Sequence, residues 1–427
     1  MERISYRFCK MTVKTGNLKW LVSCCICFCT CISHARVIEV SANAIVQSIA
    51  LAIQLADDGD TVMVLPGIYR EGNLIVNKRI SLIGIDHPIL DGENKFEIIS
   101  VTSDSVLIHG FHFIDSGISG TVDFAGLKIY DASHVVVEEN ILERTFFGIY
   151  SQHAKNCIIK NNELQSFGGD ELQCGNGIHC WKCDSMQIIH NTVKNHRDGI
   201  YFEFVTNSII WRNVSEQNVR YGLHFMFSND DTYVANYFHH NGAGVAVMFS
   251  NHVSMLGNHF SQNWGDSAYG ILLKEISDGF IIGNQFDENT TGIVMEGANR
   301  IETKRNLFSS NGHALRIQAS CMDIVLENNE FIANIFDVST NGSLVMNSFH
   351  RNFWDKYEGY DLNRNGLGDV PFHPVSLYGM ITEKNPPAMM LFGSFFTKLL
   401  DRTERVMPGL TPENLVDHEP RMKRFLM

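Results

Sequence analysis

Two residue series that repeat in step with each other constrain the fold of this chain more than any other feature. The first series consists of glycines and ends in an alanine, and most of its members are 22 or 23 residues apart. Its members are Gly126, Gly148, Gly177, Gly199, Gly222, Gly244, Gly270, Gly292 and Ala314. An asparagine follows each of these glycines by 14 residues, from Asn140 to Asn306. Repeats of this length indicate a solenoid in which each coil contacts only its neighbours.

Each glycine opens a short stretch of alternating residues that is typical of a β-strand. In Gly199–Phe204, Gly222–Phe227 and Gly244–Phe249, the first, third and fifth residues after the glycine are apolar. Because side chains alternate between the two faces of a strand, we expect these residues on the inner face and the second and fourth residues outside. We therefore predict an all-β fold, a single-stranded right-handed parallel β-helix of the pectin-lyase type, with roughly 22 residues per coil and eleven or twelve coils.

The segments outside the repeats have patterns of their own. Residues 1–35 combine a basic start with an apolar run that is too short to span a bilayer, which predicts a secretory signal peptide. An uncleaved membrane anchor is the alternative. Residues 36–59 are expected to cap the solenoid with a helix over 42–56 that begins after Ser41.

The repeats are assigned to residues 60–350, and residues 351–427 to a C-terminal cap and partner-docking tail. Within the tail, the apolar stretch 388–400 predicts an amphipathic helix that packs on the solenoid, a partner or a membrane. The net charge of −13 argues against nucleic acid as a partner, because phosphate binding requires a basic face.

The outer face of three neighbouring strands holds an unusual set of soft ligands. Equivalent positions of successive coils lie one strand spacing apart, so Met226 and Met248 should be neighbours, with His224 beside Met226 on the same face. His179 occupies the position of His224 two strands earlier and is a further candidate ligand. Thioether and imidazole groups favour Cu(I) over hard ions, so the pattern predicts a copper site. The alternative is that this face packs under the C-terminal segment or a protein partner and binds no metal.

The cysteines of the repeat region allow more than one interpretation. Cys174, Cys180 and Cys183 have a spacing that suits a thiolate metal site, or a disulfide and a free thiol. Strand alternation turns Cys180 inward and His179 outward, so these ligands should diverge. We expect core packing for Cys180 and Cys157, with a Cys174–Cys183 disulfide as an option.

A loop near the C-terminal end resembles the start of a calcium-binding loop. Asp361, Asn363 and Asn365 alternate and precede a glycine, and Asp369 follows. These oxygen ligands predict a truncated calcium site, whereas Phe372 at the twelfth position excludes a complete EF-hand. The alternative is a turn rich in Asp and Asn that binds no ion.

Parallel β-helices often act on polysaccharides, so an enzyme is the first rival interpretation. Asp198 and Glu203 offer acid–base groups for a polyuronide lyase or epimerase. The outer face nevertheless shows no run of acids along successive coils. We therefore predict that the chain is not an enzyme, and we assign no catalytic residue.

Several stretches resemble the NosD family of periplasmic β-helix proteins, which is associated with maturation of the copper enzyme nitrous oxide reductase. The stretches that carry the resemblance are 196–204, 220–230, 242–250, 268–275, 292–300 and 359–374. The resemblance implies a periplasmic location and partnership with the membrane subunit and the ATPase of an ABC transporter.

It also implies that copper arrives from a lipoprotein chaperone and is delivered toward the copper–sulfur centre of the reductase. The cysteine group at 174–183 departs from the family pattern. A second rival interpretation is a purely structural docking subunit whose Met, His and aromatic face binds only protein.

Overall fold

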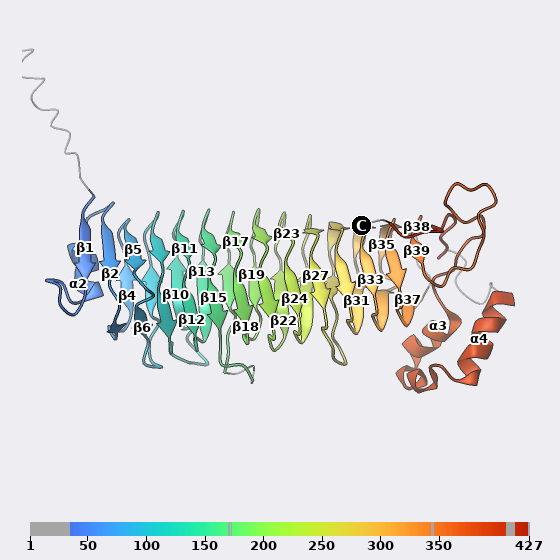
Figure 1. Ribbon diagram of the computed structural model, residues 1–427, viewed down its shortest axis with the longest axis horizontal. Helices are drawn as coiled ribbons and strands as arrows, with labels where there is room; N and C mark the ends of the chain where they lie inside the picture. Colours follow the sequence, from blue (N-terminus) through green and yellow to red (C-terminus); the bar gives the residue numbers. More distant parts are fainter. Residues whose placement is uncertain (1–34, 170, 172, 343–345, 407–414, 426–427) are drawn as a thin grey trace, which may run out of the picture. The chain divides into compact units, whose positions relative to one another are not determined.

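The computed structural model describes residues 35–169, 171, 173–342, 346–406 and 415–425. Residues 1–34, which hold nearly all of the expected signal peptide, lie outside the described part. From Val37 to Trp354 the chain winds through three parallel sheets, and most coils add one strand to each sheet (Figure 1).

The first sheet has 14 strands in the described residues. They are β1 (Val37–Val40), β2 (Thr61–Val64), β5 (Ser81–Gly84), β8 (Leu107–His109), β11 (Val136–Glu138), β14 (Ile158–Lys160), β17 (Gln187–Ile189), β20 (Ile209–Trp211), β23 (Thr232–Val234), β26 (Ser254–Leu256), β29 (Ser277–Ile282), β32 (Asn299–Lys304), β35 (Met322–Glu327) and β38 (Ser348–His350).

The second sheet has 12 strands in the same residues and carries the glycine series. They are β4 (Leu74–Val76), β7 (Ile99–Val101), β10 (Ala125–Tyr130), β13 (Phe147–Gln152), β16 (Ile178–Trp181), β19 (Ile200–Glu203), β22 (Tyr221–Met226), β25 (Ala243–Met248), β28 (Ile271–Lys274), β31 (Thr291–Glu296), β34 (His313–Ile317) and β37 (Phe336–Ser339).

The third sheet has 13 described strands. They are β3 (Ile68–Tyr69), β6 (Ile89–Asp91), β9 (His112–Ile114), β12 (Ile141–Glu143), β15 (Glu163–Gln165), β18 (Thr192–Lys194), β21 (Val214–Glu216), β24 (Tyr237–His239), β27 (His259–Ser261), β30 (Gln285–Asp287), β33 (Leu307–Ser309), β36 (Glu330–Ile332) and β39 (Phe353–Trp354).

The strand register confirms the predicted parallel β-helix. Leu223 of β22 pairs with Val245 of β25, which pairs in turn with Ile271 of β28. The expected eleven or twelve coils were too few for the 14 strands described in the first sheet. The sequence estimate missed coils because the glycine and asparagine series start only at Gly126 and Asn140, well after β1.

Close approach of neighbouring backbones explains the glycine series. A Cβ atom on Gly148 would lie 2.5 Å from the carbonyl oxygen of Gly177, and one on Gly177 would lie 2.6 Å from that of Gly199. Contacts this short exclude a side chain, so glycine fixes the spacing of the coils at this corner of the solenoid.

The asparagine series forms a buried hydrogen-bonded ladder. The Asn213 side chain donates through Nδ2 to Oδ1 of Asn236 at 3.0 Å, and its backbone N–H donates to the same atom at 2.9 Å. The ladder continues to Asn352 and ends on the buried carboxylate of Asp417. A second ladder, which the sequence analysis missed, joins Asn218, Asn241, Asn263, Asn289, Asn311 and Asn334.

The prediction that the fifth residue after each glycine faces inward was wrong. Phe204, Phe227 and Phe249 adopt φ values of 54°, 51° and 54° and are 45, 38 and 40 % exposed. Their strands end one residue earlier, because a left-handed residue turns the chain at the corner and interrupts the alternation. The three rings stack outside the core, with centroids 5.1 and 5.2 Å apart.

Both ends of the solenoid are covered by helices or returning chain. At the N-terminal end, α2 (Ile49–Leu55) begins after Ser48 rather than Ser41 and is shorter than expected. The Glu71 carboxylate accepts hydrogen bonds from the backbone N–H groups of Ile49 and Ala50, which fixes the start of this helix.

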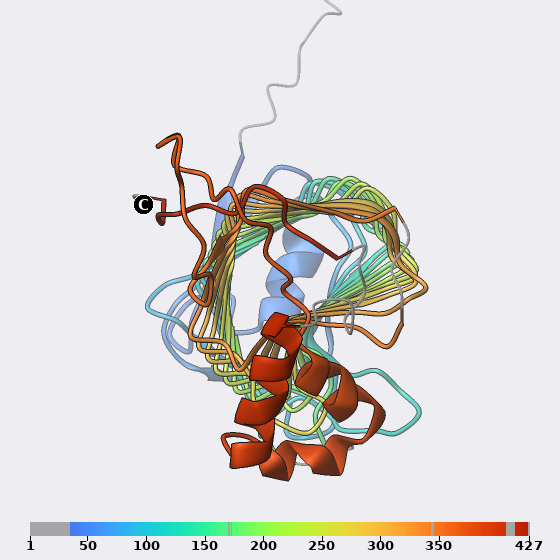
Figure 2. The ribbon, with the colours of Figure 1, turned by 90° about the vertical axis from the view of Figure 1, so that its right-hand side faces the viewer.

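The C-terminal segment contains α3 (Leu377–Lys384), the 3₁₀ helix η1 (Pro386–Leu391) and α4 (Phe395–Val406), all drawn in red in Figure 2. The α3 helix contacts β37, and Glu383 pairs with Arg316 of β34 at 2.8 Å. Among the described residues, no helix has the length and apolar character needed to cross a bilayer.

Candidate metal centre

The structure places His224, Met226 and Met248 on the outer face of the second sheet. Met226 is the register partner of Met248, and His224 precedes Met226 by two residues on the same strand. Residues two apart in a strand point to the same face, so the imidazole and the two thioethers share one surface. Both methionines are half-buried, at the end of β22 and of β25.

His179 is not brought together with this group. The register runs from His179 to Tyr201 and then to His224, which separates the histidines by two strand spacings, roughly 10 Å. The Tyr201 ring lies between them, with its centroid 4.7 Å from His179 and 4.9 Å from His224. Burial, with help from Arg197 and Lys128, lowers the pKa of His179 to about 3.

His224 faces outward but is not exposed. Only 8 % of its side chain is accessible. The ring of Tyr221 lies 4.8 Å from it, and the ring of Tyr269 stacks on Tyr221 at 6.5 Å. These tyrosines stand directly before the repeat glycines, a position that the sequence analysis did not consider.

The buried polar atoms around His224 are incompletely satisfied. Neither ring nitrogen of His224 has a hydrogen-bond partner among the described residues, and the same holds for Oδ2 of Asp198. His224 Nδ1 and Asp198 Oδ2 are 3.6 Å apart, within ion-pair range. Asp198 Oδ1 accepts a hydrogen bond from the backbone of Tyr221 at 3.3 Å.

A buried polar atom without a partner costs about 1–3 kcal/mol, so this arrangement suits a ligand that completes it. A carboxylate beside one imidazole nitrogen also resembles the way in which proteins orient histidines that bind metals through the other nitrogen.

The methionine sulfurs lie in a mixed aromatic and charged setting. The Tyr201 hydroxyl is 3.9 Å from Sδ of Met226. Glu203 is the register neighbour of Met226 on one side, and Lys274 is that of Met248 on the other. The exposed stack of Phe204, Phe227 and Phe249 follows directly after these strand ends. Both methionine side chains are thus partly exposed beside this aromatic stack.

The cysteines do not join this group. Cys180 faces the core and Cys157 is buried in it, as expected. Cys183 carries a free thiol that donates to the carbonyl of Ser151 at 3.3 Å, so the Cys174–Cys183 disulfide is not formed. Within the described ranges, no three side chains of His, Cys, Asp or Glu are placed to hold a metal ion.

The loop proposed for calcium is closed by its own hydrogen bonds. Asp361 accepts from the backbone N–H groups of Asn365 and Gly366 at 3.1 and 2.8 Å. Asn363 accepts from Asn365, and Asp369 accepts from Leu362 at 2.7 Å. These contacts form a turn without an ion, and calcium binding by Asp361, Asn363, Asn365 and Asp369 stays a prediction.

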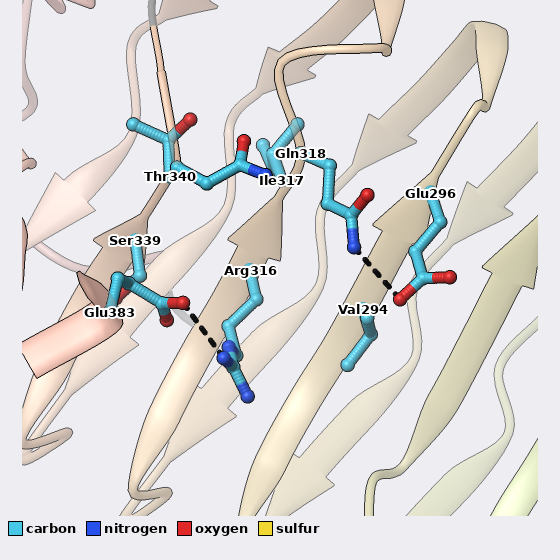
Figure 3. A pocket seen from close by; sticks show the side chains of 9 residues that line it. Val294, Glu296, Arg316, Ile317, Gln318, Ser339, Thr340 and Glu383 are labelled. Atoms are coloured by element: carbon cyan, nitrogen blue, oxygen red, sulfur yellow. Dashed lines mark hydrogen bonds and ion pairs between the residues drawn. The ribbon is translucent and has the colours of Figure 1, made fainter. Parts of the chain in front are cut away.

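A polar cleft lies near the C-terminal end of the second sheet (Figure 3). It encloses about 120 Å³ and includes Glu296, Arg316 and Glu383 in its lining. Glu383 pairs with Arg316, and Glu296 accepts a hydrogen bond from Gln318 at 2.9 Å. Both carboxylates are thus held by neighbouring side chains.

Asp198, the acid proposed for a lyase, is buried against His224.

Comparison with known proteins supports the resemblance to the NosD family. The family model described as "Periplasmic copper-binding protein (NosD)" matches residues 165–363. A protein of Stutzerimonas stutzeri named "Probable ABC transporter binding protein NosD" is 26 % identical over 403 residues, which cover 90 % of this chain and 91 % of that protein. Its namesake in Pseudomonas aeruginosa is 27 % identical over 395 residues, covering 87 % and 90 %. This chain is therefore similar to NosD proteins over most of its length.

Solved structures of similar shape extend the comparison beyond the NosD family. A DFA-IIIase of Arthrobacter chlorophenolicus, solved without its lid, superposes with a TM-score of 0.56 over 74 % of this chain and 98 % of that one, at 13 % identity. Identity this low shows a shared parallel β-helix and carries no activity to this chain. Its curated relatives are named as binding proteins.

Proposed function

We propose that this chain is a periplasmic copper-binding protein that works with an ABC transporter during maturation of nitrous oxide reductase. It receives Cu(I) from a lipoprotein chaperone and passes it toward the copper–sulfur centre of the reductase. The description of the family model supports copper binding and a periplasmic location, and the names of the two relatives support association with an ABC transporter.

The observation that carries the copper site is the buried and unsatisfied imidazole of His224 beside two thioethers. We propose that His224, Met226 and Met248 bind Cu(I), with Asp198 orienting the imidazole. Three protein ligands of this kind leave a position for a ligand from a partner, so the ion can be exchanged. The exposed rings of Phe204, Phe227 and Phe249 offer apolar contact area beside the sulfurs for the chaperone.

We assign transporter docking to the C-terminal helices. Met390 of η1 is 90 % exposed and Phe395 of α4 is 81 % exposed, although both are large apolar residues. Apolar side chains that cover nothing in their own chain are typical of a surface that a partner buries.

Replacement of Met226 and Met248 by leucine should weaken Cu(I) binding and leave the fold intact. Leucine has a similar volume but lacks the sulfur. The change therefore removes both thioether ligands and leaves the packing of the neighbouring side chains nearly unchanged. The measurement is an anaerobic competition titration of residues 36–427 with Cu(I), together with a thermal melt.

The matched control replaces Met322 and Met346, which are 48 and 69 % exposed elsewhere on the chain. We expect the affinity to fall at least about tenfold in the first variant and to stay unchanged in the control. Equal Cu(I) affinities of the unsubstituted protein, the Met226/Met248 variant and the control would show that these two methionines do not bind the ion. If the protein binds its partners equally well with and without copper, the result would favour a purely structural docking subunit.

A further inference from the structure

Two adjacent histidines on the third sheet direct their ring nitrogens at each other. His239 is the last residue of β24, and His240 follows it at the corner. Their Nδ1 atoms are 2.8 Å apart, with ring centroids at 5.1 Å and planes at 73°. Consecutive residues of a strand normally point to opposite faces. His240 adopts a left-handed conformation, with φ of 54°, and this turn brings its ring to the side of His239.

The surroundings of His239 determine which nitrogen is available. Its Nε2 lies 3.0 Å from the Glu216 carboxylate, in the preceding coil, and therefore donates its proton there. Nδ1 of His239 then carries no proton, and it accepts the hydrogen bond that Nδ1–H of His240 donates. A metal ion can replace that proton and find two imidazole nitrogens that already converge. The carboxylate–histidine pair is the arrangement that commonly orients a metal-binding imidazole.

The space beside the pair is open. A hollow of about 360 Å³ is lined by His240, Asn241, Gln262 and Trp264. His240 is exposed, whereas the side chain of His239 is only 15 % exposed. The hollow leaves room for water or for a ligand from outside to complete the coordination of an ion. The pair lies on the third sheet, and the candidate copper centre lies on the second.

We propose that His239 and His240 form a second, surface metal site, which takes an imidazole-preferring divalent cation and binds Cu²⁺ best. Neutral imidazole nitrogens suit Cu²⁺, Ni²⁺ and Zn²⁺, and affinity in such a site is greatest for Cu²⁺. Nitrogen ligands of this kind differ from the thioether set at Met226 and Met248, which favours Cu(I). The proposal does not depend on the function proposed above.

The test is titration of the folded protein, residues 36–427, with one equivalent of Cu²⁺, followed by electron paramagnetic resonance. We expect a spectrum with hyperfine coupling from two imidazole nitrogens. His240→Asn should remove one of them, and His239→Asn/His240→Asn should remove both. Glu216→Gln should weaken binding roughly 10- to 100-fold while keeping both nitrogens.

Two controls separate this site from others. His252→Asn removes a histidine that is 61 % exposed on another corner and should leave the spectrum unchanged. Met226→Leu/Met248→Leu should also leave it unchanged, even if that variant loses Cu(I). A thermal melt of each variant establishes that it is folded. An unchanged spectrum in His239→Asn/His240→Asn, or a single imidazole in the unsubstituted protein, would overturn the proposal.

Discussion

Phe225→Asp should unfold several coils around β22, whereas Phe227→Asp, two residues later, should be tolerated. Phe225 is fully buried, with ring centroids 5.2 Å from Phe202 and 5.4 Å from Tyr233. Its loss removes about 3–5 kcal/mol of packing, and an unpaired carboxylate in the core adds several kcal/mol more. That sum is comparable with the whole stability of an ordinary domain.

The matched position Phe227 is 38 % exposed and lies outside the core. A carboxylate there remains in water and costs mainly the stacking with Phe204 and Phe249. Circular dichroism melts of the two variants provide the comparison. A normal melt for Phe225→Asp, or equal destabilisation by both changes, would contradict the register of the strand.

Asp231→Asn should stabilise the protein, and the gain should increase with pH. Asp231 is 1 % exposed, its Oδ2 has no hydrogen-bond partner among the described residues, and burial raises its pKa to about 8. The folded state therefore holds a proton that the unfolded state releases near pH 4. Between pH 4 and 8 the unfolded state binds fewer protons, so the free energy of unfolding falls as pH rises.

Asparagine imitates the protonated acid and can still accept the hydrogen bond that Ser208 N–H donates at 2.8 Å. The stabilisation should be near zero below pH 4 and approach a maximum of no more than about 6 kcal/mol above pH 8. Chemical denaturation at pH 5, 7 and 8.5 measures it. Asp230→Asn, at a neighbouring side chain that is 56 % exposed, is the control and should change little. A gain that is independent of pH would show that Asp231 is ionised in the folded protein.

The coil repeat could be predicted from the sequence because single backbone and side-chain contacts enforce it. Gly148 and Gly177 recur where a Cβ would collide with the next coil, and Asn213 and Asn236 recur where one side chain satisfies the next. Periodic constraints of this kind are visible in one sequence. The strand β1 lacks both series and lies in the segment that the sequence analysis assigned to the N-terminal cap.

The surroundings of the candidate copper centre were less predictable. The coil repeat placed Met226 beside Met248, but it could not show that Tyr221 packs against His224 and that Tyr269 stacks on Tyr221. It also failed at Phe227, because a left-handed corner residue does not follow the alternation. Burial of an outward-facing side chain depends on its neighbours in the next coils, and their rotamers are not encoded in the spacing.

The central claim is that Cu(I) binds through thioether sulfur and the His224 imidazole. The most direct measurement is copper K-edge X-ray absorption of the Cu(I)-loaded protein, residues 36–427, compared with Met226→Leu/Met248→Leu and with His224→Asn. The account predicts sulfur and imidazole scattering in the unsubstituted protein. Sulfur should be lost in the first variant and imidazole in the second. Sulfur scattering that persists without Met226 and Met248 would place the ion elsewhere in the chain and contradict the proposed site.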